Sequence, residues 1–157
     1  MSISDVNTAI QLILDSGESY RPGNGAADDM LSAFENRLGV RFPPSYRYFL
    51  AKMGTLSFMG HQFYGITKSG LNAESIPCVL WATERSREKG HITDSMLRIK
   101  MSGYGPFYVL DLSQRNAEGE GAVLELPVQG ISGGSEKIAD DFGSFLLGEI
   151  TSALSDG

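Results

Sequence analysis

Two adjacent prolines, Pro43 and Pro44, constrain the fold of this chain more than any other feature of its sequence. Each proline fixes its own φ at about −65° and pushes the preceding residue out of the helical region. Residues 40–44 must therefore be extended. Apolar residues recur with helical spacing on both sides, and Gly39 offers the left-handed conformation at which helices commonly end. The sequence thus predicts a helix, a proline corner and a second helix over 46–53. We expect three apolar side chains of this corner to be buried: Phe42, Phe49 and Leu50.

The same periodicity predicts three further helices. Apolar residues at steps of three and four indicate one over about 4–14, and the helix before the corner begins at Asp28 or Asp29. Residues 76–89 can begin as a strand, but their charged end before Gly90 favours a short helix. A last helix takes the apolar residues from Ile138 to Leu154, with Ser135 as its cap. The glycine- and proline-rich stretch 16–25 is expected to be an exposed loop.

Short apolar runs between turn residues predict strands in the middle of the chain. They lie at 56–58, 63–66, 97–101, 107–110 and 122–126. Their connections are too short for parallel crossovers, so the sheet should be mostly antiparallel. Helices first, strands next and a closing helix indicate an α+β fold with the helices packed on that sheet. The length of 157 residues suits a single domain over 1–157.

Charge excludes some classes of function. The net charge is −6, which argues against broad binding to nucleic acid or to an anionic membrane, since both need a basic surface. The acidic residues are concentrated in 1–36 and 111–157, whereas lysine and arginine predominate between them. Two interpretations stay open: a mixed, solvated surface, or an acidic face that docks a basic partner.

Few residues are suited to catalysis or to binding a metal ion. His61 and His91 lack the spacing that brings two imidazoles onto one metal ion, and Cys78 stands in an apolar run where a buried, inert thiol is expected. No nucleophile or phosphate-binding motif is present. The sequence therefore predicts no catalytic residue, no metal and no cofactor. With neither a membrane-spanning run nor a secretory leader, a cytoplasmic protein is expected.

A partner-binding surface is the remaining possibility. Three carboxylates near predicted turns are candidates, with two tyrosines beside them as aromatic anchors. The carboxylates are Asp111, Glu118 and Glu120, and the tyrosines are Tyr104 and Tyr108. Trp81, with the basic stretch 85–89, marks an alternative face. For the carboxylates the other interpretation is a solvated loop, and for Trp81 it is core packing.

Residues 34–50 resemble a known family signature. The pattern E-x-x-L-G-x-x-L-P-x-x-Y-x-x-F-L of the SUKH superfamily, named for fungal cell-wall-assembly regulators and their bacterial relatives, begins here at Glu35 and ends at Leu50. The segments 63–66, 109–111 and 138–146 follow in the family's order, so the resemblance covers about 28–147. Phe42 replaces the usual leucine, and Met53-Gly54-Thr55 replaces the common Asn-Gly-Gly.

The resemblance implies an SMI/KNR-like fold and a non-enzymatic protein-binding domain. In bacteria such a domain is typically an immunity protein that neutralises a toxin, often a nuclease, delivered by neighbouring cells. On this basis we expect a protein partner, most simply a toxin domain, and a chain that is a monomer or a weak dimer. A regulatory scaffold like the fungal relatives is the alternative, and a small hydrolase is the third.

Overall fold

Seven short strands form two antiparallel sheets in the computed structural model, which describes residues 2–156. The first sheet has the order β1-β2-β3 and the second the order β4-β5-β6-β7. The strands are β1 (Tyr20–Pro22), β2 (Leu56–Phe58), β3 (His61–Phe63), β4 (Met96–Met101), β5 (Phe107–Arg115), β6 (Gly121–Leu126) and β7 (Glu136–Ala139). The helices are α1 (Ser2–Ser16), α2 (Asp28–Leu38), α3 (Pro44–Met53), α4 (Val79–Glu88) and α5 (Phe142–Asp156).

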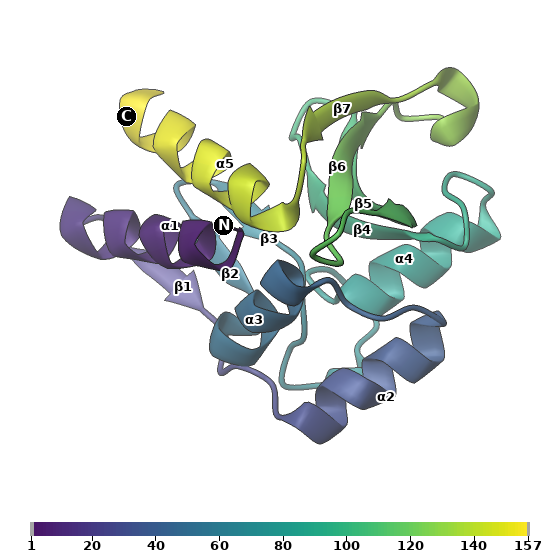
Figure 1. Cartoon of the computed structure of the whole chain (residues 1–157), viewed down its shortest axis with the longest axis horizontal. Coiled ribbons are helices and arrows are strands. Elements are labelled where there is room, and N and C mark those ends of the chain that lie inside the picture. The colour runs from purple at the N-terminus through teal and green to yellow at the C-terminus, as the bar shows by residue number, and fades with distance from the viewer. Residues whose placement is uncertain (1, 157) are drawn as a thin grey trace.

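The helices lie around the two sheets (Figure 1). α1 and α5 run side by side and parallel, α3 lies beneath them, and α2 and α4 close the other side of the molecule. The α+β class and the antiparallel pairing are confirmed. The chain builds two sheets rather than one, joined where the amide of Tyr64, just after β3, donates to the carbonyl of Ile99 in β4 at 2.9 Å.

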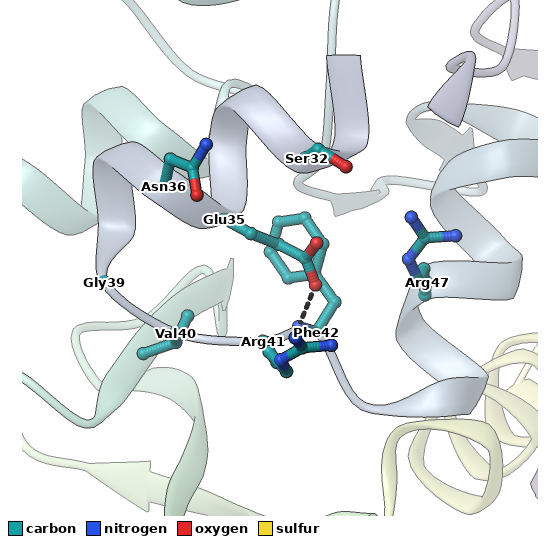
Figure 2. A pocket seen from close by; sticks show the side chains of 8 residues that line it. All are labelled: Ser32, Glu35, Asn36, Gly39, Val40, Arg41, Phe42 and Arg47. Carbon is teal, nitrogen blue, oxygen red and sulfur yellow. Dashed lines mark hydrogen bonds between the residues drawn. The ribbon is translucent and has the colours of Figure 1, made fainter. Parts of the chain in front are cut away.

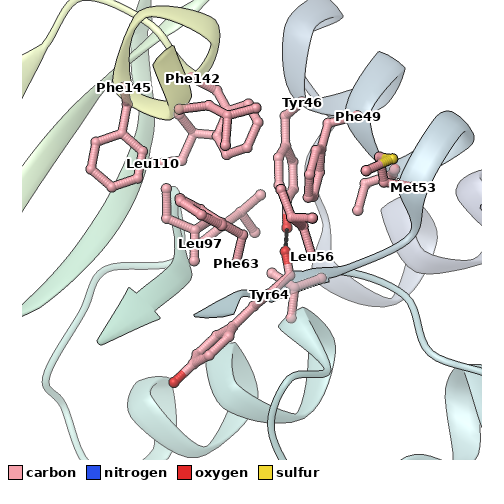
Figure 3. Packing of buried hydrophobic residues seen from close by; sticks show 14 of the residues in the cluster. Tyr46, Phe49, Met53, Leu56, Phe63, Tyr64, Leu97, Leu110, Phe142 and Phe145 are labelled. Carbon is pink, nitrogen blue, oxygen red and sulfur yellow. Dashed lines mark hydrogen bonds between the residues drawn. The ribbon is translucent and has the colours of Figure 1, made fainter. Parts of the chain in front are cut away.

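The proline corner has the predicted form. Gly39 ends α2 at φ 72°, and Pro43 and Pro44 begin α3. Phe42, Phe49 and Leu50 are all buried, as expected. Tyr46 and Phe49 stack in the core, and the ring of Phe142 from α5 lies 4.8 Å and 5.1 Å from their centroids (Figure 3). The corner therefore anchors the C-terminal helix to the centre of the molecule.

The prediction for the C-terminal segment is wrong at its start. Ile138 belongs to β7, which pairs with β6, and α5 begins only at Phe142. Asp141 takes the capping role that we expected of Ser135: its carboxylate accepts the amide of Ser144 at 2.8 Å. The backbone of 136–139 pairs with β6 although its side chains point largely to solvent, so an apolar pattern cannot separate this strand from the helix that follows.

The stretch 16–25 is exposed, as predicted, but it is not all loop. Residues 20–22 form β1, which pairs with β2 through the backbone. All three of its side chains are exposed, so no alternation of apolar and polar residues predicts this strand. Gly23 and Gly25 then pass so close to the last turn of α3 that a Cβ would collide with the carbonyl oxygens of Met53 and Ala51.

Candidate functional site

The hollow at the proline corner is built by the family signature (Figure 2). It has a volume of about 600 Å³ and lies between α2 and the start of α3, with Arg41 and Arg47 on its rim. Glu35 crosses it, and its carboxylate accepts the amide of Phe42 at 2.7 Å. That bond holds the extended segment against α2. The signature glutamate thus serves the fold of the corner.

A second hollow is connected to the corner through hydrogen bonds of Arg115 and Glu120, and we call it the acidic hollow. Its volume is about 580 Å³, and it is enclosed by the β5–β6 turn, β7 and the start of α5. Four carboxylates line it against two cations. The carboxylates are Asp111, Glu120, Asp140 and Asp141, and the cations are Arg115 and Lys137.

Both cations of the acidic hollow are already engaged. The guanidinium of Arg115 donates to the carbonyls of Gly119, at 3.1 Å, and of Arg41. Lys137 forms an ion pair of 2.5 Å with Asp140, and both side chains are well exposed. An exposed pair of this kind is easily exchanged for another partner, because solvent screens it. The hollow therefore presents net negative charge.

Its other carboxylates are held in fixed positions. Asp111 accepts the amide and hydroxyl of Ser113 at 3.0 Å and 2.7 Å. Asp141 caps α5 and also accepts the hydroxyl of Ser2 at 2.6 Å. Carboxylates that are oriented in advance lose little side-chain entropy when a partner binds. Charge and rigidity together suit this surface to a cationic partner.

Glu120 corrects the sequence prediction, because it is not a carboxylate of an exposed turn. Its side chain is buried on the floor of the hollow and accepts the amide of Ser45 at 2.9 Å and the hydroxyl of Ser45 at 2.8 Å. Ser45 lies in the first turn of α3, whose N-cap, Pro43, carries no side-chain acceptor. Glu120 supplies that cap from another element. Burial raises the pKa of Glu120, and the two bonds from Ser45 oppose the rise.

The remaining predicted residues do not gather at one site. Glu118 is exposed in the β5–β6 turn beside the acidic hollow. Tyr104 is highly exposed but lies in the β4–β5 turn, at the other end of β5. Tyr108 is buried, with its ring centroid 5.1 Å from that of Phe145. Trp81 is half-buried on α4 and packs against the core. Only the three carboxylates share one neighbourhood.

Sequence reasoning missed a buried ion pair under α5. Lys100 of β4 is buried, and its ammonium lies 3.2 Å from the carboxylate of Glu149. The rings of Phe63 and Tyr108 lie 5.6 Å and 5.4 Å from the same ammonium. His61 faces Glu149 at 4.0 Å, and burial, then the charge of Lys100, lower its pKa. These residues come from four elements, and nothing in their spacing along the chain connects them.

Comparison with families of known proteins matches residues 28–146 to the family described as SMI1-KNR4 cell-wall, SUKH_6. That is more than half of the chain, and it contains the corner, both sheets' central strands and the start of α5. The chain belongs to this family. A comparison with curated proteins gives no match.

The SMI1-KNR4 domain uses its signature for packing, since Leu38, Phe49 and Leu50 are all buried. Within residues 2–156 of the SMI1-KNR4 domain, no helix is both long and apolar enough to cross a membrane. Over the same residues, no three or more His, Cys, Asp or Glu side chains are grouped in a way that would hold a metal ion. Cys78 is buried as predicted, and burial raises the pKa of its thiol.

Proposed function

We propose that this SMI1-KNR4 domain is an immunity protein of the cytoplasm that binds a basic toxin domain and blocks it. Membership of the family supports a protein-binding role. The observation that carries the proposal further is the acidic hollow, where four carboxylates face two cations that already have partners. A nuclease toxin presents lysine and arginine to nucleic-acid phosphates, so a surface of carboxylates can occupy the same cations.

The contacts are assigned to the exposed members of this surface. Asp140 is largely exposed and held only by Lys137, and Glu118 projects from the neighbouring turn. Asp111 lines the same hollow, half-buried and fixed by Ser113. Glu120 contributes by positioning the turn. It is excluded from direct contact because its carboxylate is buried against α3.

The first test identifies the partner and its effect. The tagged chain is used to isolate its partner from the native cell, and the partner is then expressed alone or together with the chain. We expect the partner to arrest growth when expressed alone and to be harmless when the chain is present. A partner that is harmless by itself contradicts the immunity role and supports the regulatory scaffold instead.

The second test locates the interface. Exchanging Glu118 and Asp140 for lysine should slow association with the partner and remove its protective effect, because like charges then face each other. A double exchange of exposed acids elsewhere, Glu18→Lys with Glu74→Lys, changes the net charge equally and serves as the control. Association of the unchanged chain should slow as ionic strength rises. Equal association rates for both double variants at low salt would place the interface on another face.

A further inference from the structure

A smaller hollow lies at the other end of β5, where the β2–β3 turn, the approach to α4 and the β4–β5 turn meet. Its volume is about 160 Å³, and we call it the Tyr64 hollow. Besides two glycines it is lined by Gln62, Tyr64, Ile76, Met101 and Ser102. The lining holds hydrogen-bond donors and no carboxylate. This lining differs from that of the acidic hollow and suits a negatively charged ligand.

Tyr64 lines this hollow and carries a buried, unpaired hydroxyl. Its backbone is fixed in the core, where its carbonyl accepts the hydroxyl of Tyr46 at 2.7 Å. Its ring points away from the stacked rings of Tyr46 and Phe49 (Figure 3). The side chain is almost completely buried, yet its hydroxyl has no hydrogen-bond partner among the described residues. Buried hydroxyls are nearly always paired, so an unpaired one at a hollow points to a ligand.

Arg98 lies behind Met101, one of the residues that line the hollow. Its guanidinium donates to the hydroxyl of Ser86 at 2.9 Å and to the thioether sulfur of Met101 at 2.7 Å. It also stacks on the ring of Phe107, 4.1 Å from the centroid. No carboxylate among residues 2–156 forms an ion pair with it. A thioether is a weak acceptor, so one face of a half-buried cation lacks a strong partner.

The two donors belong to one electrostatic environment. Burial raises the pKa of Tyr64, and the charge of Arg98 opposes that rise. Met101 connects them, because it lines the Tyr64 hollow and covers the guanidinium. The register of β4 against β5 also shifts between Arg98 and Lys100.

We propose that the Tyr64 hollow binds a carboxylate, which accepts hydrogen bonds from the Arg98 guanidinium and the Tyr64 hydroxyl after the Met101 side chain swings aside. Met101 is unbranched and 38% exposed, so it can change rotamer without disturbing the core. Gln62 and Ser102 supply further polar contacts, and Ile76 supplies an apolar wall. The small volume admits one carboxylate and a short attached group.

The test follows the methyl resonance of Met101 by NMR while sodium acetate or sodium malonate is added at constant ionic strength. Sodium chloride serves as the reference anion. We expect a saturable shift of the Met101 methyl signal with the carboxylates and no saturable shift with chloride. Identical responses to all three salts, or no response to the carboxylates, would overturn the proposal.

Variants decide which groups bind. Tyr64→Phe removes only the unpaired hydroxyl, so the fold should keep its melting temperature while the dissociation constant rises about tenfold or more. Arg98→Gln should abolish the saturable shift of the Met101 signal. Met101→Ala lacks that signal, so its binding of acetate is measured by the rise in melting temperature, and it should bind acetate more tightly than the unchanged chain. Tyr20→Phe and Arg21→Gln, at exposed positions of β1, are matched controls that should bind as the unchanged chain does. Unaltered affinity in Tyr64→Phe would contradict the assigned geometry.

A carboxylate can come from a free metabolite-sized acid or from the end of a polypeptide. The peptide Gly-Gly-Ala with a free C-terminus and the same peptide with a C-terminal amide separate these sources. Tighter binding of the free peptide than of acetate assigns the hollow to chain ends. Tighter binding of acetate assigns it to small acids. Equal binding of the free peptide and its amide contradicts a carboxylate site.

Discussion

Glu120 stands 75 residues from Ser45 in the sequence, yet its carboxylate completes the first turn of α3. Helix starts with a proline at the cap position leave amides without a side-chain acceptor, and the usual remedy is local. Here the acceptor comes from the β5–β6 turn. In that turn the side chain of Asn116 accepts the amides of Glu118 and Glu120. A single turn therefore stabilises the corner and one wall of the acidic hollow.

Glu120→Ala should lower the free energy of unfolding by about 1–3 kcal/mol, because it leaves the buried amide of Ser45 without an acceptor. Glu120→Gln keeps an acceptor and should cost much less. Thermal unfolding of both variants measures the difference, with Glu118→Ala in the same turn as the exposed control. Equal losses in Glu120→Ala and Glu118→Ala would show that the contact with Ser45 does not stabilise the fold.

His61 should make stability sensitive to mild acid. Burial and Lys100 lower its pKa in the folded chain from the ordinary value of 6.5, while Glu149 opposes them. Just below that value the unfolded chain binds a proton more readily than the folded one, so stability falls as the pH falls through this window. His61→Gln should flatten this part of the stability profile, measured by urea unfolding across the window.

The position and burial of some residues could be predicted from the sequence, and those of others could not. Phe49 and Leu50 were predictable, because helical spacing fixes which side of α3 they occupy. Glu118 was correctly placed in a turn, but Asp111 was not: β5 continues to Arg115, beyond the predicted end at residue 110, and Asp111 lies in the middle of that strand. The burial of Glu120 depends on Ser45, and the contacts of Arg98 and Lys100 depend on residues from other elements. Such pairings have no local pattern, so periodicity could not reveal them.

Among the elements, α1 and α5 form an unusual pair because they lie parallel (Figure 1). Their positive N-terminal ends are therefore adjacent, which is unfavourable unless negative charge is near. Asp141 accepts the hydroxyl of Ser2, and Asp5 accepts that of Ser144 at 3.3 Å. The hydroxyl of Ser2 also accepts the amide of Gly143 at 3.0 Å. Ser2 of α1 thus caps the first turn of α5, and the carboxylates of Asp141 and Asp5 place negative charge beside the paired helix starts.

The close approach of these helices needs Gly143. A Cβ at this position would overlap the backbone carbonyl of Ser2, whereas a Cβ at Gly148 of the same helix would meet nothing within 4 Å. Gly143→Ala should therefore destabilise the fold by about 1–3 kcal/mol or more. Gly148→Ala should stabilise it by up to about 1 kcal/mol, because alanine favours the helix. Thermal unfolding of the two variants tests the packing, and shifts of the same sign would contradict it.

The elements that sequence reasoning missed share one physical property. β1 and β7 are held by backbone hydrogen bonds to one neighbour, and their side chains are mostly exposed. A hydrophobic pattern predicts a strand only where side chains are buried. It therefore predicts β5 and β6, whose residues pack on the core, but not edge strands whose side chains are exposed. α4 was placed correctly because its charged end and Gly90 mark a helix terminus.

At the scale of the whole molecule, one apolar cluster joins all five helices to strands of both sheets. Among residues 2–156, a second, small cluster around Phe107 and Val109 lies apart from it, on the other side of the second sheet. Such continuity favours cooperative unfolding of the chain as one domain.

We expect a single unfolding transition in urea. Trp81 fluorescence reports on α4, and far-ultraviolet circular dichroism reports on all helices, so the two midpoints should coincide. Chymotrypsin digestion near the midpoint offers an independent check for a stable fragment. Separate midpoints or a persistent fragment would indicate that the chain contains more than one folding unit.

The parallel pairing of α1 and α5 also governs how the molecule assembles on the ribosome. α1 is synthesised before the helix against which it packs, and the intervening residues must emerge first. Until then α3 is the helix available to cover the apolar stripe of α1, formed by Val6, Ala9 and Ile13, and the side that faces α5 stays uncovered. Bringing α1 and α5 together closes a loop of most of the chain, which is slow compared with forming the hairpins that lie between the two helices in the sequence. Part of the apolar surface of α1 therefore stays exposed until α5 has been synthesised.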